Sequence, residues 1–119
     1  MKIPVSLKIY AAILESGLKT GLPVISADTC AKLLAIVYAS NSEMVTHCPK
    51  MVLDCGYAQK RFHIEGSEVV DADFAEKLRG YVRDIEREIE ETKKETGCYK
   101  MPEWCNEFVR ERYGIKKLF

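Results

Sequence analysis

The stretch DADFAEKLRGYVRDIEREIEETKKETG, residues 71–97, carries the strongest helical pattern in the chain. Asp73 and Glu76 resemble a capping box at its start, and Gly97 is typical of a helix end. Apolar side chains recur three or four positions apart, so they share one helix face: Phe74, Leu78, Tyr81, Val82, Ile85 and Ile89. We predict one long amphipathic helix of about 25 residues, roughly 37 Å in length.

The last turns of this helix, EREIEETKKETG (86–97), offer only Ile89 for burial. A compact domain of this size has a radius of gyration near ~13–14 Å, so a helix of this length spans the whole molecule. We therefore expect the final turns to project into solvent or to contact a partner subunit, which would make the chain a homodimer.

Carboxylates crowd the predicted helix surface. Glu86 and Glu90 share one face, and so do Glu91 and Glu95. A pair of glutamates can bind a divalent cation or act as acid and base. Here a lysine or arginine stands near each pair, which is typical of a solvated, salt-bridged helix surface. We predict no catalytic residues and no metal ligands among them.

A second helical pattern closes the chain in MPEWCNEFVRERYG, residues 101–114. Pro102 suits the first turn of a helix, and Gly114 suits the position just past its end. Trp104 and Phe108 stand four residues apart and would share a face. We predict a short C-terminal helix.

The N-terminal part also favours helices. SLKIYAAILESG (6–17) has helical spacing, although residues 3–9 alternate as a strand would. In residues 21–41, Ser26 can cap a helix and Asp28 would lie in its first turn. Two helices joined by a short Gly/Pro linker predict an N-terminal helical hairpin.

Residues 44–70 change character, because Pro49 and Gly56 interrupt them and short β-type runs appear around Val52 and Phe62. We predict two or three short strands here, paired as an antiparallel hairpin, and the tail at 115–119 could add an edge strand. The predicted fold class is therefore α+β and helix-dominated: an N-terminal helical hairpin, a small antiparallel sheet, the long amphipathic helix and the short C-terminal helix, in a single domain over residues 1–119.

The composition is that of an ordinary globular protein, with 47% hydrophobic and 30% charged residues and a net charge of zero. Non-specific nucleic-acid binders usually carry a basic excess, and this chain has none. The first residues, MKIPVSLKIYAAILESG, contain Lys8 and Glu15, which interrupt the apolar run that a signal peptide needs. No stretch approaches the ~20 apolar residues that span a bilayer. We expect a cytoplasmic protein.

Two segments, GCYKMPEWC (97–105) and CPKMVLDC (48–55), each place two cysteines seven positions apart. Structural zinc sites usually draw ligand pairs from two to four residues apart, so this spacing is not specific. The odd count of five cysteines, with no secretion signal, favours reduced, buried thiols over disulfides. We expect no cofactor. The alternative, a zinc-binding structural module, would use Cys48, Cys55, Cys98 and Cys105.

Catalytic motifs are weak. His47 and His63 are the only histidines, and His63 could activate Cys48 or Cys55 across a hairpin. Nothing marks an oxyanion hole or a nucleophile elbow beside them, and GLKTG (17–21) lacks the spacing of a phosphate-binding loop. We predict that the protein is not an enzyme.

Nucleic-acid binding is a second alternative, because basic residues stand near aromatic ones. The basic clusters are Lys60 with Arg61, and Arg110, Arg112, Lys116 and Lys117. The neighbouring aromatic residues are Trp104, Tyr113 and Phe119. Glutamates at 103, 107 and 111 dilute the positive field, so this binding would be weak.

These observations favour a small, non-enzymatic interaction or regulatory protein that acts by binding another macromolecule. A protein partner is expected, a nucleic acid is less favoured, and no membrane is involved. Inhibitors or regulators from phages or other mobile elements have this profile.

Overall fold

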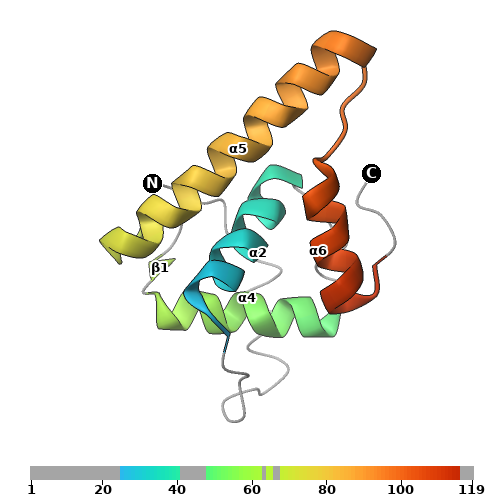
Figure 1. Ribbon diagram of the computed structural model, residues 1–119. Helices are drawn as coiled ribbons and strands as arrows, with labels where there is room; N and C mark the ends of the chain where they lie inside the picture. The colour runs from blue at the N-terminus through green and yellow to red at the C-terminus, as the bar shows by residue number, and fades with distance from the viewer. Residues whose placement is uncertain (1–24, 41–47, 63, 66–67, 116–119) are drawn as a thin grey trace.

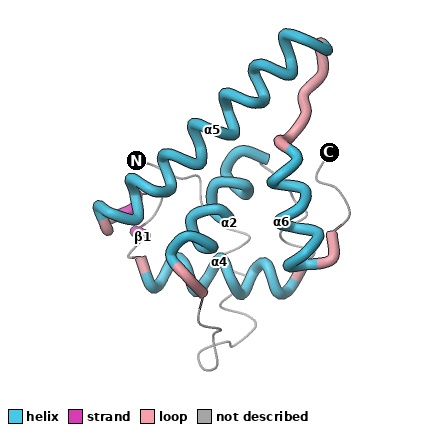
Figure 2. Tube along the Cα trace, viewed as in Figure 1, coloured by secondary structure: helices cyan, strands magenta, loops and turns pink. Residues whose placement is uncertain are grey.

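The computed structural model describes residues 25–40, 48–62, 64–65 and 68–115. These ranges contain four helices: α2 (Ala27–Ser40), α4 (Pro49–Arg61), α5 (Ala72–Thr96) and α6 (Glu103–Tyr113). Helix α2 lies in the middle, with α5 on one side, α4 on another and α6 beside the end of α4 (Figures 1 and 2).

The long amphipathic helix is confirmed as α5, with 25 residues. Its cap is Asp71, two residues before the predicted Asp73: the Asp71 carboxylate accepts a hydrogen bond from the backbone N–H of Phe74 at 2.8 Å. Asp73 lies in the first turn, where its negative charge interacts favourably with the positive end of the helix dipole. The helix ends at Gly97, which takes the left-handed conformation at φ 74°.

Helix α2 is the centre of the core. Ser26 starts it as predicted, because its hydroxyl accepts the backbone N–H of Thr29 at 3.1 Å. Buried residues occur around most of its circumference: Cys30, Ala31, Leu33, Leu34, Ala35 and Ile36. The helix expected over residues 6–17, and the strand alternative beside it, lie outside the described residues. Of the predicted helical hairpin, the described residues therefore include only the second helix, α2.

The predicted α+β class is wrong. Thirteen residues of the segment expected to form a sheet are helix α4, which begins at Pro49. Met51, Cys55 and Ala58 recur at helical spacing and are buried, and this period outweighs the β-branched residue Val52. In the described part of the chain, extended pairing is limited to two residues in each of β1 (Ile64–Glu65) and β2 (Glu68–Val69). These two-residue strands lie between α4 and α5, and the architecture of the described residues is helical.

The core draws fully buried side chains from every described helix and from the α5–α6 connection: Leu33, Ile36, Met51, Leu78, Ile85, Met101 and Val109. Phe62 and Phe74 stack at 3.9 Å between ring centroids where α4 leads into α5. Each such side chain contributes about 1.5–3 kcal/mol by its removal from water.

The short C-terminal helix is confirmed as α6. Pro102 is its cap residue, and its carbonyl accepts the N–H of Cys105 at 3.0 Å. Gly114 ends the helix in the left-handed conformation at φ 72°. The edge strand predicted beyond it lies almost wholly outside the described residues.

The end of α5 stands clear of the other helices (Figure 1). Ile85 is fully buried and Ile89 is partly buried, whereas all residues from 93 to 100 are exposed. The molecule is accordingly elongated, with extents of 46 × 30 × 23 Å. Among the helices the structure describes, none has the length and apolar character needed to cross a membrane.

Candidate functional site

A buried polar cluster joins α4 to α6. Asp54 is 0% exposed, and its Oδ2 accepts hydrogen bonds from the Tyr113 hydroxyl at 2.6 Å and the Arg112 Nε at 3.1 Å. Burial and the bond to Asp54 raise the pKa of Tyr113. Burial lowers the pKa of Arg112, but its interactions with Tyr113 and Asp54 outweigh this and raise it. The cluster therefore holds Arg112 charged and Tyr113 protonated.

The second oxygen of Asp54, Oδ1, is buried and has no hydrogen-bond partner within the described part of the chain. An unpaired buried polar atom costs about 1–3 kcal/mol, so the other bonds of this carboxylate must outweigh that cost. Asp54 is closed off from solvent, and its bonds to Arg112 and Tyr113 hold α4 and α6 together.

The cysteines do not form the four-ligand set considered from the sequence. Cys55 and Cys105 are buried, Cys98 is exposed beyond the end of α5, and Cys48 is half-buried at the start of α4. Over the described ranges, no three His, Cys, Asp or Glu side chains are grouped so that they could hold a metal ion.

All five thiols are free, and the three buried ones, Cys30, Cys55 and Cys105, are expected to be unreactive near neutral pH. Burial raises the pKa of Cys30 to about 11 and that of Cys105 to about 12. Burial also raises the pKa of Cys55, with the nearby Asp54 carboxylate adding to the effect. These thiols are protonated near neutral pH and are poor nucleophiles. The two histidines of the Cys/His alternative lie outside the described residues.

Two members of the basic clusters, Arg112 and Arg61, form contacts within the fold. The Arg112 guanidinium is bound to Asp54, and the Arg61 guanidinium donates to the Ile25 carbonyl and lies 4.9 Å from the Phe62 ring centroid. Arg110 is exposed. The side chains of Lys60 and residues 116–119 lie outside the described parts.

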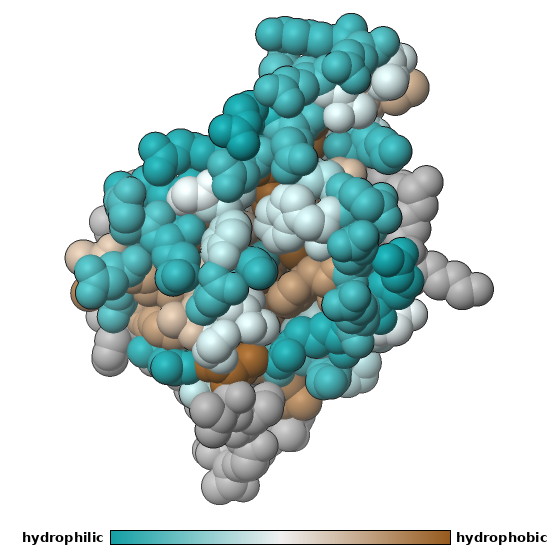
Figure 3. Space-filling view, in the orientation of Figure 1, coloured by the Kyte–Doolittle hydropathy of each residue, from teal (hydrophilic) through white to brown (hydrophobic). Residues whose placement is uncertain are grey.

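Four half-buried aromatic side chains line up on one face of the molecule: Tyr81, Trp104, Phe108 and Tyr113. We call them the aromatic strip. The Tyr81 and Trp104 ring centroids are 5.8 Å apart, and those of Phe108 and Tyr113 are 6.3 Å apart. Trp104 and Phe108 stand four residues apart on α6, so they share a helix face. Figure 3 shows pale and brown side chains on this face, set between the teal ones of α5 and α6.

The Tyr81 end of the strip is polar and closed by charge pairs. The Tyr81 hydroxyl donates to the Asp28 carboxylate, and Lys32 approaches that carboxylate at 3.2 Å. The hydrogen bond from Tyr81 and the nearby Lys32 and Lys77 lower the pKa of Asp28. Burial raises the pKa of Tyr81 to about 12. Tyr81 is therefore a fixed hydrogen-bond donor.

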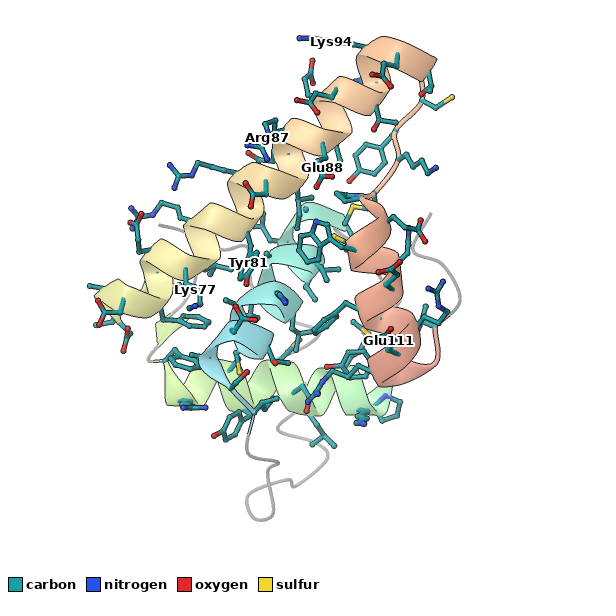
Figure 4. All side chains as sticks on the ribbon, viewed as in Figure 1. Lys77, Tyr81, Arg87, Glu88, Lys94 and Glu111 are labelled. Atoms are coloured by element: carbon teal, nitrogen blue, oxygen red, sulfur yellow. The ribbon has the colours of Figure 1, made fainter. Side chains whose placement is uncertain are left out.

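Two rows of acidic side chains, one on α5 and one on α6, include neighbours of the strip such as Glu88 and Glu103, and we call them the acidic rims. The α5 rim follows a 4–3–4 spacing on one side of the helix and comprises Asp84, Glu88, Glu91 and Glu95. The α6 rim repeats every four residues and comprises Glu103, Glu107 and Glu111. Glu88 and Glu111, labelled in Figure 4, mark the two rims.

The rims differ in how they are neutralised. Glu88 accepts a hydrogen bond from the Trp104 indole at 3.2 Å, and Asp84 pairs with Arg87 at 3.4 Å. Glu91, Glu95 and the α6 rim form no ion pair with the residues that the structure describes. The ion pairs within α5 join Glu76 to Arg79 and Arg83, and Asp84 to Arg87. The glutamates for which salt bridges were predicted, Glu86, Glu90, Glu91 and Glu95, form none with the described residues.

The buried cluster and the aromatic strip are not apparent from the sequence. Asp54 and Arg112 are 58 residues apart, and nothing local signals their contact. The spacing of Trp104 and Phe108 was the available signal for the strip. Comparisons with protein-family models, with curated proteins and with solved structures gave no match for this chain.

Proposed function

We propose that this chain is a small, non-enzymatic interaction or regulatory protein that acts in the cytoplasm by binding another protein. One observation carries the proposal: the last turns of α5, residues 90–96, are ordered helix with little to pack against. Isolated helical turns are marginal in water, and tertiary packing normally supplies helix stability. A projecting helix of this kind is suited to a partner that covers it.

A preformed helix also lowers the cost of association. Its backbone is already ordered, so binding does not have to supply that conformational entropy. Helices that dock on grooves or against other helices are a common mode of recognition. The five free thiols suit a reducing compartment, which supports the cytoplasmic assignment. A regulator or inhibitor carried by a phage or mobile element would fit this description.

Cys98 gives direct access to the projecting end. It is exposed, whereas Cys48 is half-buried and Cys30, Cys55 and Cys105 are buried. A thiol-directed photo-crosslinker should therefore attach mainly at Cys98. Photolysis in an extract of the encoding organism is expected to give one dominant crosslinked protein, which mass spectrometry identifies and which binds again in purified form.

The matched control moves the label to the other end of the same helix. In the double variant C98S/D73C the crosslinker sits in the first turn of α5, where Asp73 is exposed. We expect the dominant product to be lost. Equal yields from both positions, or no specific product from Cys98, would refute the proposal.

Self-association is the other use of a projecting helix. Sedimentation of the purified chain over a range of concentrations measures it directly. If the chain forms a homodimer, and substitutions at the end of α5 weaken that dimer, the partner is a second copy of the chain. A monomer at every concentration would remove that part of the proposal.

A further inference from the structure

The partner's chemistry can be specified further, and this step rests on the proposed function. We propose that the aromatic strip and its acidic rims bind a basic segment of the partner protein. A lysine or arginine side chain of that segment lies over Trp104 and Phe108, between the carboxylates of the two rims.

The strip already binds cations at its two ends. The Lys32 ammonium lies 5.8 Å from the Tyr81 ring centroid, and the Lys50 ammonium lies 5.9 Å from that of Tyr113. Trp104 and Phe108, between these ends, have no cation from the described residues over their rings. Tryptophan gives the strongest cation–π interaction of the aromatic side chains. As far as the described residues go, the middle of the strip is thus a cation-binding surface that no cation of the chain occupies.

Charge complementarity points to the same partner. The second half of α5, residues 84–96, has six acidic and three basic residues. Arg87, one of the three, pairs with Asp84 and lies on the side of the helix away from Glu88 (Figure 4). Glu91 and Glu95 form no ion pair with the described residues and lie on the same side of α5 as Glu88, which contacts Trp104, and the exposed α6 rim adds more negative charge. Such a surface attracts a basic segment and speeds its approach.

The same charges disfavour two other occupants. Phosphates of a nucleic acid would meet carboxylates on both rims. If a second copy docked on this face, its own rims would lie opposite like charges. A basic polypeptide can form cation–π contacts with the rings and ion pairs with the carboxylates.

Trp104 is the chain's one tryptophan, so its fluorescence reports on the strip directly. The probe is an amphipathic lysine–leucine peptide without tryptophan, and the matched control replaces every lysine with glutamate. We expect a saturable change in Trp104 fluorescence with the lysine peptide and none with the glutamate peptide. Added salt should weaken the binding, because it screens exposed charges.

Paired charge reversals locate the binding face. E91K/E95K alters the α5 rim, whereas E86K/E90K makes the same charge change at exposed positions on the far side of that helix. Calorimetry should show about tenfold weaker peptide binding for the first variant, a loss of about 1.4 kcal/mol, and little change for the second. Equal weakening by both variants, or no saturable binding to the unaltered chain, would overturn the inference.

The two proposals fail differently. If the crosslinker at Cys98 captures a specific partner while the lysine peptide does not bind, the basic-segment inference is wrong and the interaction function stands. If no partner is captured from Cys98, the function proposal fails first, whatever the peptide does.

Discussion

Asp54 is the residue whose loss should cost most. Its carboxylate is fully buried and binds Arg112 and Tyr113, so replacement by alanine leaves both donors without their acceptor. We expect Asp54→Ala to reduce the free energy of unfolding by about 3 kcal/mol. Urea denaturation followed by circular dichroism measures this loss.

The matched control for Asp54 is Asp84, which also pairs with an arginine but is exposed. Asp84→Ala should cost less than about 1 kcal/mol, because exposed ion pairs contribute little. Equal losses for the two variants would show that the buried cluster does not pin α6 to α4.

The buried thiols make stability fall at alkaline pH. Burial raises the pKa of Cys105 from an ordinary value near 9 to about 12 in the folded state. Between these values the folded state keeps a proton that the unfolded state has lost, so the free energy of unfolding decreases as pH rises above 9. The contribution of this thiol is up to about 1.4 kcal/mol per pH unit.

Denaturation between pH 8 and pH 11 under reducing conditions tests this dependence. Cys105→Ala should give a shallower decrease with pH than the unaltered chain, whatever its loss in absolute stability. Cys98→Ser should leave the slope unchanged, since Cys98 is exposed. An unchanged slope in the Cys105 variant would contradict the assigned burial effect.

At the scale of the element, two glycines of α5 have opposite roles. Gly80 lies inside the helix, and a Cβ built there meets nothing within 4 Å, so Gly80→Ala should stabilise by about 0.5–1 kcal/mol. Gly97 has φ 74°, so Gly97→Ala should destabilise by about 1 kcal/mol. Thermal unfolding of the two variants should show shifts of opposite sign, and shifts of the same sign would contradict the C-terminal boundary of α5.

Sequence reasoning succeeded where a single helix carried its own signals. Helices α5 and α6 have a regular apolar period and a terminal glycine, and both were predicted within a few residues. Helix α4 was missed because Val52 and Phe62 suggested strands, while the helical spacing of Met51, Cys55 and Ala58 is short and includes small side chains.

The candidate site was harder to predict because its parts come from different helices. Periodicity indicated that Trp104 and Phe108 share a face, but it could not place Tyr81 of α5 at 5.8 Å from Trp104. The glutamates of α6 were judged only to dilute a basic cluster. In the structure, Arg112 binds the buried Asp54, so its charge is neutralised there. The glutamates of α6 are left exposed, and their negative charge is not offset by Arg112.

At the scale of the whole molecule, the stabilising core and the proposed binding surface lie in different regions. The core around α2 holds the buried apolar residues and the Asp54 cluster. The second half of α5 and the outer face of α6 carry exposed charge beside half-buried aromatic rings. Substitutions at the rims should therefore change binding while leaving the fold intact.

The most direct test of the account is amide hydrogen exchange of the chain with and without the partner captured from Cys98. We predict that bound partner slows exchange in the second half of α5 and in α6, and leaves α4 and the first turns of α5 unchanged. Slowed exchange confined to α4, or no change along α5 and α6, would contradict the assignment of this face as the binding surface.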